Sequence, residues 1–330
     1  MKKILQYLFE HKTLSRETSR EVLTNIARGL YNDSEITAFI TVFLMRSITI
    51  DELQGFRDAL LDLCVRVDLN GHSTIDIVGT GGDGKNTFNI STLACFIVAG
   101  TGQKVSKHGN YGASSISGSS NVMEQLGYTF KNDAGRLRQE VEPAGSCFLH
   151  APLFHPALKT VGPIRKNLGI RTFFNMLGPM VNPAFPRFQL IGVYNLEMAR
   201  VYNYLLQQTE GFFTIIHALD GYDEISLTGD TKVITNNGEK IMTPEELGKR
   251  MVNAADIYGG NSVEEAAKLF LKILKVEGTW AQNAVVLANA AMALHSTGAY
   301  PRYDDAYAAA VDSLESGRAY GSLQKLISLQ

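Results

Sequence analysis

The chain has 330 residues, of which 45% are hydrophobic, and its 31 basic side chains face 33 acidic ones for a formal net charge of −2. A chain of this length and apolar content can build one large domain and one small one. The balanced charge argues against general attraction to nucleic acid or to an anionic membrane surface. The sequence contains no run of about 20 apolar residues, so we expect no transmembrane helix and no membrane partner.

The cysteines and the first residues bear on the compartment. Cys64, Cys95 and Cys147 lie far apart and form no C-x-x-C pair, so we expect reduced thiols in the core. The first twelve residues contain too short an apolar run for a signal peptide. Together these features predict a cytoplasmic protein.

Residues 1–70 show helical periodicity almost throughout, and no segment typical of a strand appears before residue 75. Ser15, and Asp33 or Ser34, are the expected starts of two of these helices. The first part of the chain is therefore predicted to be all-helical.

From residue 75 onward, short apolar runs alternate with helical segments. This alternation predicts an α/β fold with a central, mostly parallel sheet flanked by helices. The last stretch, from Ser262 to Leu329, is expected to form helices that pack on the sheet. The expected strands are 75–78, 103–106, 146–149, 189–193, 213–218 and 232–235.

A glycine-rich run, GTGGDGKNTFNIST, occupies residues 79–92 between the first expected strand and an apolar helix. Strand, glycine loop and helix start form a layout that binds phosphate. Glycines let the backbone approach the anion, and the free N–H groups and the helix dipole hold it. Asn89 is the expected N-cap of the helix.

Two other phosphate-binding motifs fit this run only in part. Its glycines match G-x-G-x-x-G, but a dinucleotide fold also needs an acid about 20 residues further on, and residues 103–108 contain none. The run also matches the start of a P-loop, but Asn86 stands where Ser or Thr would hold magnesium. Asp83 would also repel the phosphates that a P-loop encloses.

A second cluster, KHGNYGASSISGSSN, spans residues 107–121. Lys107 and His108 end the second expected strand and supply donors, and the Gly/Ser loop that follows adds uncharged ones. The loop leads into an expected helical turn at 122–127. A solvated linker is the alternative interpretation of this composition, but a linker rarely joins a buried strand directly to a helix.

A third cluster is acidic. The expected strand 213–218 leads into Asp220, Asp223 and Glu224. Adjacent carboxylates at the carboxyl end of a strand suit magnesium. Taken alone, these acids fit a polar surface loop equally well, but two neighbouring phosphate loops favour a metal site.

These motifs resemble the fingerprints of the anthranilate phosphoribosyltransferase family, enzymes of tryptophan synthesis. The resemblance continues through HAPLFHPALKTVGPIRKNLGIRTFFNMLGPMVNP at 150–183, QLIGVYN at 189–195 and DGYDEISLTG at 220–229. It extends to the C-terminal helices around 263–326. It therefore covers essentially the whole chain, with several independent motifs in the same order.

The resemblance implies a domain organisation. Residues 1–70 and about 152–183 would form a small, discontinuous helical domain that mediates a homodimer. Residues 71–151 and 184–330 would form the α/β catalytic domain. The cleft between the two domains is the expected place of the chemistry.

The resemblance also implies the reaction. The phosphoribosyl group of 5-phosphoribosyl 1-pyrophosphate (PRPP) would pass to the amine of anthranilate, with two Mg²⁺ ions per subunit. No covalent nucleophile is expected, because the protein would act by positioning and charge stabilisation. The implied metal ligands are Ser91, Asp223 and Glu224. The implied PRPP-binding residues are Gly79, Gly82, Asp83, Thr87, Asn89, Ile90, Ser91, Thr92, Lys107, His108, Gly109, Asn110, Ser114, Ser115 and Ser119.

Anthranilate carries a carboxylate, for which Arg165 is the implied partner because a guanidinium fork matches that group. His155 is implied less firmly, since His150 and His155 also fit structural roles. The implied anthranilate-binding residues are Gly79, His108, Asn110, His155, Arg165, Gly178 and Pro179.

The chain departs from the common family pattern at three positions. Tyr111 and Gly112 stand where many members have Arg and Ala, and Asn121 stands where many have Asp. These changes bear on the number of cations and the shape of the channel near the phosphate.

Two other classes of protein remain as alternatives. A pyrimidine nucleoside phosphorylase shares the architecture, but its loops resemble KHSTGGVGDK, which this chain lacks. A non-catalytic, nucleic-acid-binding relative would need a basic surface, and it would leave the acids at 223–224 unexplained.

Overall fold

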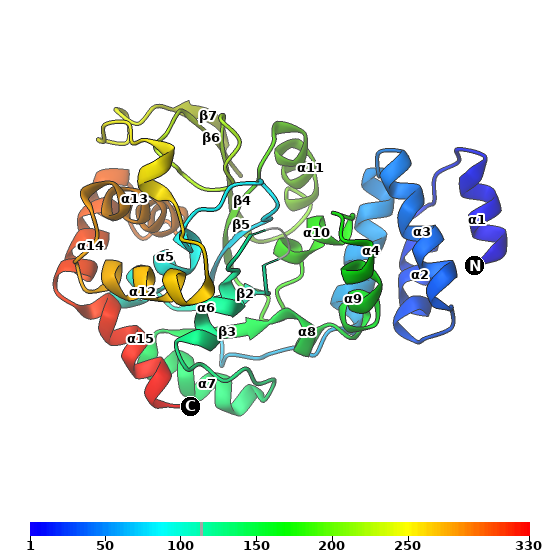
Figure 1. The fold of residues 1–330 in the computed structure, drawn as a ribbon, viewed down its shortest axis with the longest axis horizontal. Coiled ribbons are helices and arrows are strands. Elements are labelled where there is room, and N and C mark those ends of the chain that lie inside the picture. Colours follow the sequence, from blue (N-terminus) through cyan, green and yellow to red (C-terminus); the bar gives the residue numbers. More distant parts are fainter. Residues whose placement is uncertain (113–114) are drawn as a thin grey trace. The chain divides into compact units, whose positions relative to one another are not determined.

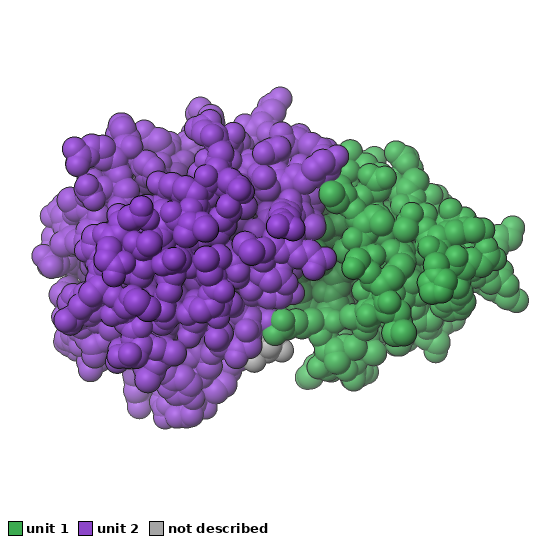
Figure 2. Space-filling view, turned by 90° about the horizontal axis from the view of Figure 1, so that it is seen from above, with its two compact units in different colours: residues 1–67, 151–183 green, residues 68–150, 184–330 purple. Residues whose placement is uncertain are grey.

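The computed structural model describes residues 1–112 and 115–330. They form two compact units, one of residues 1–67 and 151–183 and the other of residues 68–150 and 184–330 (Figure 2). The first unit is all-helical, and the second has a seven-stranded sheet flanked by helices (Figure 1). The predicted fold class is confirmed.

The helices of the first unit begin at well-formed caps. Ser15 accepts the N–H of Thr18 and starts the second helix, as predicted. The third helix begins earlier than expected, because Asn32 is its cap and forms a reciprocal capping box with Glu35. The elements of this unit are α1 (Lys2–Phe9), α2 (Arg16–Ala27), α3 (Asp33–Met45), α4 (Ile50–Leu63), α8 (Ala151–Phe154), α9 (Pro156–Leu168), α10 (Phe174–Leu177) and the 3₁₀ turn η1 (Gly178–Met180).

The sheet of the second unit has the order β3-β2-β1-β4-β5-β6-β7. In this order, neighbouring strands from β3 to β5 are parallel. The β5–β6 and β6–β7 pairs are antiparallel. The expected strand at 103–106 begins two residues too early, and β7 was not predicted because it is short, polar and mostly exposed. The strands are β1 (Ile75–Gly79), β2 (Val105–Gly109), β3 (Ser146–His150), β4 (Phe188–Gly192), β5 (Phe212–Ala218), β6 (Thr231–Thr235) and β7 (Gly238–Met242).

Two apolar helices, α5 and α13, form the centre of the core beside the sheet. Both are buried along most of their length, and α11 covers the opposite face (Figure 1). No helix in the described ranges is long and apolar enough to cross a membrane. The helices of this unit are α5 (Ile90–Gly100), α6 (Ser119–Gln125), α7 (Ala134–Ala144), α11 (Leu196–Leu206), the 3₁₀ turn η2 (Ala254–Ile257), α12 (Val263–Leu274), α13 (Trp280–Ser296), α14 (Tyr303–Glu315) and α15 (Arg318–Ser328).

The strand order reverses between β1 and β4, which lie side by side although α5 to α10 separate them in the chain. In open parallel sheets, ligands bind outside the carboxyl ends of the strands at such a reversal. Gly79 ends β1 and pairs in register with Gly192, which ends β4. The topology therefore directs attention to the loops that follow these two glycines.

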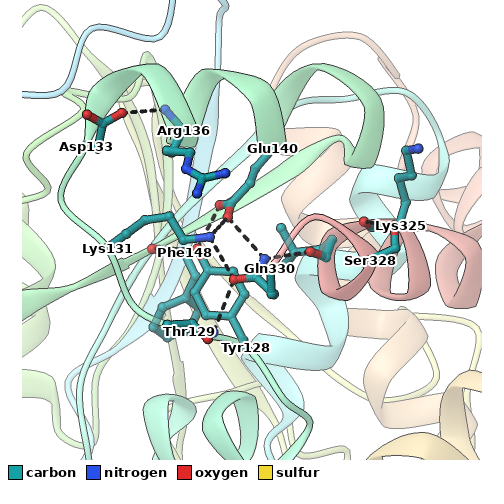
Figure 3. Close-up of polar contacts among 11 residues, drawn as sticks. Tyr128, Thr129, Lys131, Asp133, Arg136, Glu140, Phe148, Lys325, Ser328 and Gln330 are labelled. Carbon is teal, nitrogen blue, oxygen red and sulfur yellow. Dashed lines mark hydrogen bonds and ion pairs between the residues drawn. The ribbon is translucent and has the colours of Figure 1, made fainter.

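A buried polar cluster joins the end of the chain to α7 (Figure 3). Glu140 is 1% exposed and forms an ion pair with Lys131. The Tyr128 hydroxyl donates to Glu140 Oε2 at 2.7 Å, and Gln330 Nε2 donates to Glu140 Oε1 at 3.2 Å. Lys131 Nζ also donates to Gln330 Oε1 at 2.7 Å. These bonds satisfy a carboxylate that would otherwise be costly to bury.

Candidate active site

Three carboxylates meet at the strand reversal. Asp223 and Glu224 follow β5, and Asp83 comes from the glycine loop after β1. One carboxylate oxygen from each lies within 4.8 Å of the others. The N–H of Gly81 donates to Asp223 Oδ2 at 2.7 Å, and the Thr87 hydroxyl donates to Glu224 Oε2 at 3.4 Å. Hydrogen bonds thus join the glycine loop to the acidic pair.

The glycines that end β1 and β4 make this approach possible. A Cβ on Gly79 would lie 2.3 Å from Asp223 Oδ2, and a Cβ on Gly192 would lie 1.5 Å from the Asp223 carbonyl oxygen. Any side chain at either position would displace Asp223 from its place at the ends of β1 and β4. The two positions therefore require glycine for close approach.

The electrostatics of the cluster favour a cation. Burial, followed by the charge of Asp83, raises the pKa of Asp223 to about 7. Burial and the charges of Asp223 and Asp83 raise the pKa of Glu224 well above its ordinary value. The Lys107 charge opposes both shifts only in part. A divalent cation would relieve the repulsion, and carboxylate oxygens are ligands that Mg²⁺ prefers, so these residues fit magnesium.

The glycine loop carries the chain from β1 into α5. Gly81, Gly82 and Gly84 have φ values of +62°, +77° and +73°, a backbone region that glycine enters without steric cost. Asn89 precedes α5 as predicted, but its side chain makes no cap bond. Its Nδ2 donates instead to the Ser117 carbonyl at 3.0 Å. Asn89 is therefore the N-cap residue by position, and its side chain joins the glycine loop to the Ser/Gly loop.

Ile90, Ser91 and Thr92 form the first turn of α5. The positive end of the helix therefore faces the glycine loop, which favours an anion there. Thr87 pairs with Tyr258 in an isolated bridge, and this contact fixes the loop before the helix starts.

Lys107 and His108 lie within β2 and are buried, at 3% and 2% exposure. Lys107 Nζ donates to the Ile77 carbonyl at 2.6 Å, and the His108 N–H donates to Asp76 Oδ1 at 3.2 Å. An ammonium has three donors, and Lys107 uses one of them on the neighbouring strand. Its charge acts on the carboxylate cluster from within the sheet.

Gly109 ends β2, and the Ser/Gly loop follows. The Asn110 carbonyl accepts the Ser120 N–H at 3.1 Å and the Ser119 hydroxyl at 3.3 Å. Ser115 is half-buried, whereas Ser114 lies outside the described residues. The backbone of the loop is thus folded back onto the start of α6.

The departures from the family pattern have local structural roles. Asn121 Oδ1 accepts the N–H groups of Gly112 and Gly118, at 2.9 and 3.0 Å. A Cβ on Gly112 would lie 2.6 Å from the Ser115 carbonyl oxygen, so an alanine here requires a different loop. The Tyr111 ring packs edge-on against His150, with 4.9 Å between the ring centroids.

The helical unit holds the remaining expected site residues. Arg165 Nη2 donates to Asn175 Oδ1 at 3.1 Å, and the guanidinium lies 5.5 Å from the centre of the Phe174 ring. Burial lowers the pKa of Arg165, and no carboxylate in the described ranges forms an ion pair with it. The cation is therefore half-buried, and its side-chain hydrogen bond in the described ranges goes to a neutral amide.

His155, Gly178 and Pro179 lie in the same unit. His155 precedes α9 and is fully buried, and burial lowers its pKa to about 4, so it is neutral at pH 7. Gly178 and Pro179 begin η1, and a Cβ on Gly178 would meet no atom within 4 Å. The turn thus has open space beside its glycine.

Sequence reasoning gave one residue of the site an incomplete role and missed another. Asp83 was assigned to PRPP alone, yet it completes the carboxylate cluster. An acid inside a phosphate-binding loop was the available signal, since it implies a cation nearby. Asn289 holds the backbone beside Glu224, and its only signal was a polar residue within an apolar helix.

Sheet, glycine loop and carboxylate cluster define a two-domain glycosyl transferase. The sequence model of the glycosyl transferase family a/b domain matches residues 71–320, and that of the family's helical bundle domain matches residues 2–64.

Close relatives narrow this class. The chain is 58% identical over 330 residues to the anthranilate phosphoribosyltransferase of Flavobacterium johnsoniae, covering 100% of this chain and 99% of the relative. It is 55% identical over 329 residues to that of Bacteroides thetaiotaomicron, with the same coverage. The chain therefore belongs to the anthranilate phosphoribosyltransferase family and is a pentosyltransferase enzyme, as its motifs predicted.

Solved structures agree with this result. The crystal structure of anthranilate phosphoribosyltransferase from Thermus thermophilus superimposes with a TM-score of 0.90 at 31% identity, covering 98% of both chains. The enzyme from Saccharomyces cerevisiae, in complex with PRPP and Mg, has a TM-score of 0.88 at 27% identity, covering 96% of this chain and 93% of that chain.

Proposed function

We propose that this protein transfers the phosphoribosyl group of PRPP to the amine of anthranilate in a magnesium-dependent reaction of tryptophan biosynthesis. The observation that carries the proposal is the meeting of Asp83, Asp223 and Glu224 with a glycine loop at the strand reversal. The yeast enzyme is solved in one structure with PRPP and Mg and in another with 4-fluoroanthranilate, which supports the same ligands here.

The two loops of the α/β unit would bind PRPP. Its pyrophosphate would lie across residues 79–83, the start of α5 at 89–92 and the carboxylate pair. Its remaining anionic oxygens would meet Lys107 and the loop that contains Ser115 and Ser119. Backbone N–H groups and the positive end of α5 suit a polyanion of this kind.

Asp223 and Glu224, with Ser91, would hold magnesium, and two ions per subunit are proposed. Bound metal would neutralise charge on the pyrophosphate as it leaves. The protein's own part is to keep buried Asp223 and half-buried Glu224 together, and the Gly81 N–H and the Thr87 hydroxyl each hold one of them.

Anthranilate would bind through its carboxylate to Arg165, whose half-buried guanidinium has an amide as partner and no ion pair with an acid in the described residues. A guanidinium fork can donate two parallel bonds to a carboxylate. The other residues proposed to bind anthranilate are Gly79, His108, Asn110, His155, Gly178 and Pro179. His155 is neutral at pH 7 and adds no second positive charge.

The reaction then needs positioning rather than a covalent intermediate. The anthranilate amine would attack the anomeric carbon as pyrophosphate leaves, and that centre would invert. Holding both reactants in one geometry removes much of the entropic barrier. Fixed donors aimed at the leaving group stabilise the charge that develops there.

The assembly and location of the enzyme are also proposals. We propose a homodimer formed through the helical unit and a cytoplasmic location, as the family resemblance implies.

A fluorescence assay tests the proposal. Anthranilate is fluorescent, and its loss is followed with purified protein, PRPP and magnesium. We expect loss that requires all components and stops when a chelator is added. Loss without magnesium would overturn the metal role, and no loss at all would overturn the reaction. Phosphorolysis of thymidine or uridine, measured on the same sample, would then test the phosphorylase alternative.

A further inference from the structure

Lys85 rests on an aromatic ring beside the carboxylate cluster. Its Nζ lies 4.5 Å from the centre of the Tyr222 ring, and Tyr222 directly precedes Asp223 in the chain. Tyr222 is 4% exposed, so its ring forms a fixed wall. The lysine thus places a positive charge at the rim of the proposed PRPP site.

This lysine forms no ion pair with any carboxylate in residues 1–112 and 115–330. Yet Asp83 lies two residues before it and Asp223 follows its aromatic partner. Contact with a ring face is weaker than a charge-assisted hydrogen bond. The three ammonium donors are therefore available to an anion that enters the loop.

The backbone around Lys85 is held firmly. The Lys85 N–H donates to Asp83 Oδ1 at 2.9 Å. Asn86 bonds on both sides, through Nδ2 to the Gly260 carbonyl at 2.7 Å and through its own carbonyl to the Gly259 N–H at 2.7 Å. With the backbone fixed, rotation about the side-chain bonds is the simplest way to move the ammonium from the ring to a ligand.

We propose that Lys85 binds the pyrophosphate group of PRPP and the pyrophosphate product, its ammonium leaving the Tyr222 ring to donate to a phosphate oxygen. The inference rests on the proposed function. Pyrophosphate must enter beside three carboxylates, so a positive charge is needed there to offset the repulsion. Lys107 has one of its three donors on the Ile77 carbonyl and cannot give all of them to the anion. Negative charge develops on the leaving pyrophosphate in the transition state, and a cation that contacts this group stabilises that charge.

Binding of inorganic pyrophosphate, measured by calorimetry at saturating magnesium, tests this assignment. Lys85→Met keeps the length of the side chain and removes its charge, and we expect it to weaken binding about tenfold, the effect of losing one charge-assisted hydrogen bond. Lys85→Arg should stay within about twofold of the wild type. Lys275→Met is the matched control, since Lys275 also lies over a tyrosine ring, that of Tyr320 at 5.4 Å.

Steady-state kinetics provide a second readout. Lys85→Met should raise the KM for PRPP and the inhibition constant of pyrophosphate by similar factors, with the KM for anthranilate unchanged. If Lys85 only packs against the Tyr222 ring, Lys85→Met would leave pyrophosphate binding unchanged, because methionine can still pack on that ring.

The outcomes separate this inference from the proposed function. An active wild type whose Lys85→Met variant binds pyrophosphate normally would overturn the inference alone. So would equal weakening in Lys275→Met. A wild type that neither consumes anthranilate nor binds pyrophosphate would overturn both.

Discussion

Asn289 holds both backbone polar groups of Ile225, the residue directly after Glu224. The Ile225 N–H donates to Asn289 Oδ1 at 3.0 Å, and Asn289 Nδ2 donates to the Ile225 carbonyl at 2.9 Å. The same Nδ2 donates to the Val285 carbonyl at 2.9 Å. A buried amide on α13 thus substitutes for a neighbouring strand and fixes the segment that carries the carboxylate pair.

Asn289→Ala should therefore impair both stability and metal binding. It leaves the buried N–H and carbonyl of Ile225 without partners, which costs about 2–3 kcal/mol of unfolding free energy. We also expect a several-fold rise in the magnesium concentration needed for half-maximal activity. Chemical denaturation and magnesium titration measure the two effects. Asn283→Ala, on the same helix, is the control, and an unchanged magnesium requirement in Asn289→Ala would refute the positioning role.

The glycine loop and the helices around it were predictable because their signals are local. Gly81 and its neighbours need positive φ, and Ser15 caps a helix with its own side chain. β7 was not predictable, because its residues alternate little and it pairs only at the exposed edge. Tertiary pairing decides such a strand, not local propensity.

The composition of the site was predictable in part. The acidic pair at 223–224 stood out after an apolar strand. The position of Asp83 in the same cluster depends on the strand order, which places only β4 between β1 and β5. The hydrogen bond from the Asn89 side chain to Ser117 was not predictable either, because the two residues are 28 positions apart in the chain.

Neutralising the acidic pair should weaken the binding of magnesium. We expect Asp223→Asn with Glu224→Gln to lower turnover by at least about 100-fold at low magnesium, given the loss of metal-assisted stabilisation of the leaving group. Initial rates over a magnesium series measure the effect. Glu239→Gln, which removes an exposed carboxylate paired with Lys232 at the edge of the sheet, should leave these rates unchanged. Normal activity of the double variant at low magnesium would show that the metal lies elsewhere.

The raised pKa of Asp223 predicts how stability without metal depends on pH. Its pKa of about 7 exceeds the ordinary value near 3.9, so the native state binds the proton more tightly than the unfolded state. The stability from this group is complete below about pH 4 and is lost as pH rises through about 7. In a chelator, Tm should therefore fall more between about pH 5 and pH 8 in the wild type than in Asp223→Asn. Calorimetry showing equal slopes would contradict the shift.

The Glu140 cluster should stabilise the second unit. Lys131→Met leaves the Glu140 carboxylate buried without its cation, which we expect to lower the unfolding free energy by about 3 kcal/mol. Adding Glu140→Gln to that variant should recover part of the loss, because the buried charge is then gone. Lys12→Met, which breaks an exposed pair with Glu10, should cost less than about 1 kcal/mol. Urea denaturation of the four proteins measures these differences, and equal losses for Lys131→Met and Lys12→Met would refute the cluster's role.

Arg165→Ala should separate the two substrates. Because the guanidinium is proposed to bind the anthranilate carboxylate, its loss should raise the KM for anthranilate at least about tenfold, the effect of a charge-assisted pair. The KM for PRPP should change less than about twofold. Lys166→Ala removes an exposed charge from the same helix and should leave both constants unchanged. Anthranilate fluorescence at varied concentrations of each substrate measures the constants. Equal rises in KM for both substrates would mean that Arg165 stabilises the fold of the helical unit and does not bind the anthranilate carboxylate. Loss of the α9 structure would be expected to affect both substrates alike.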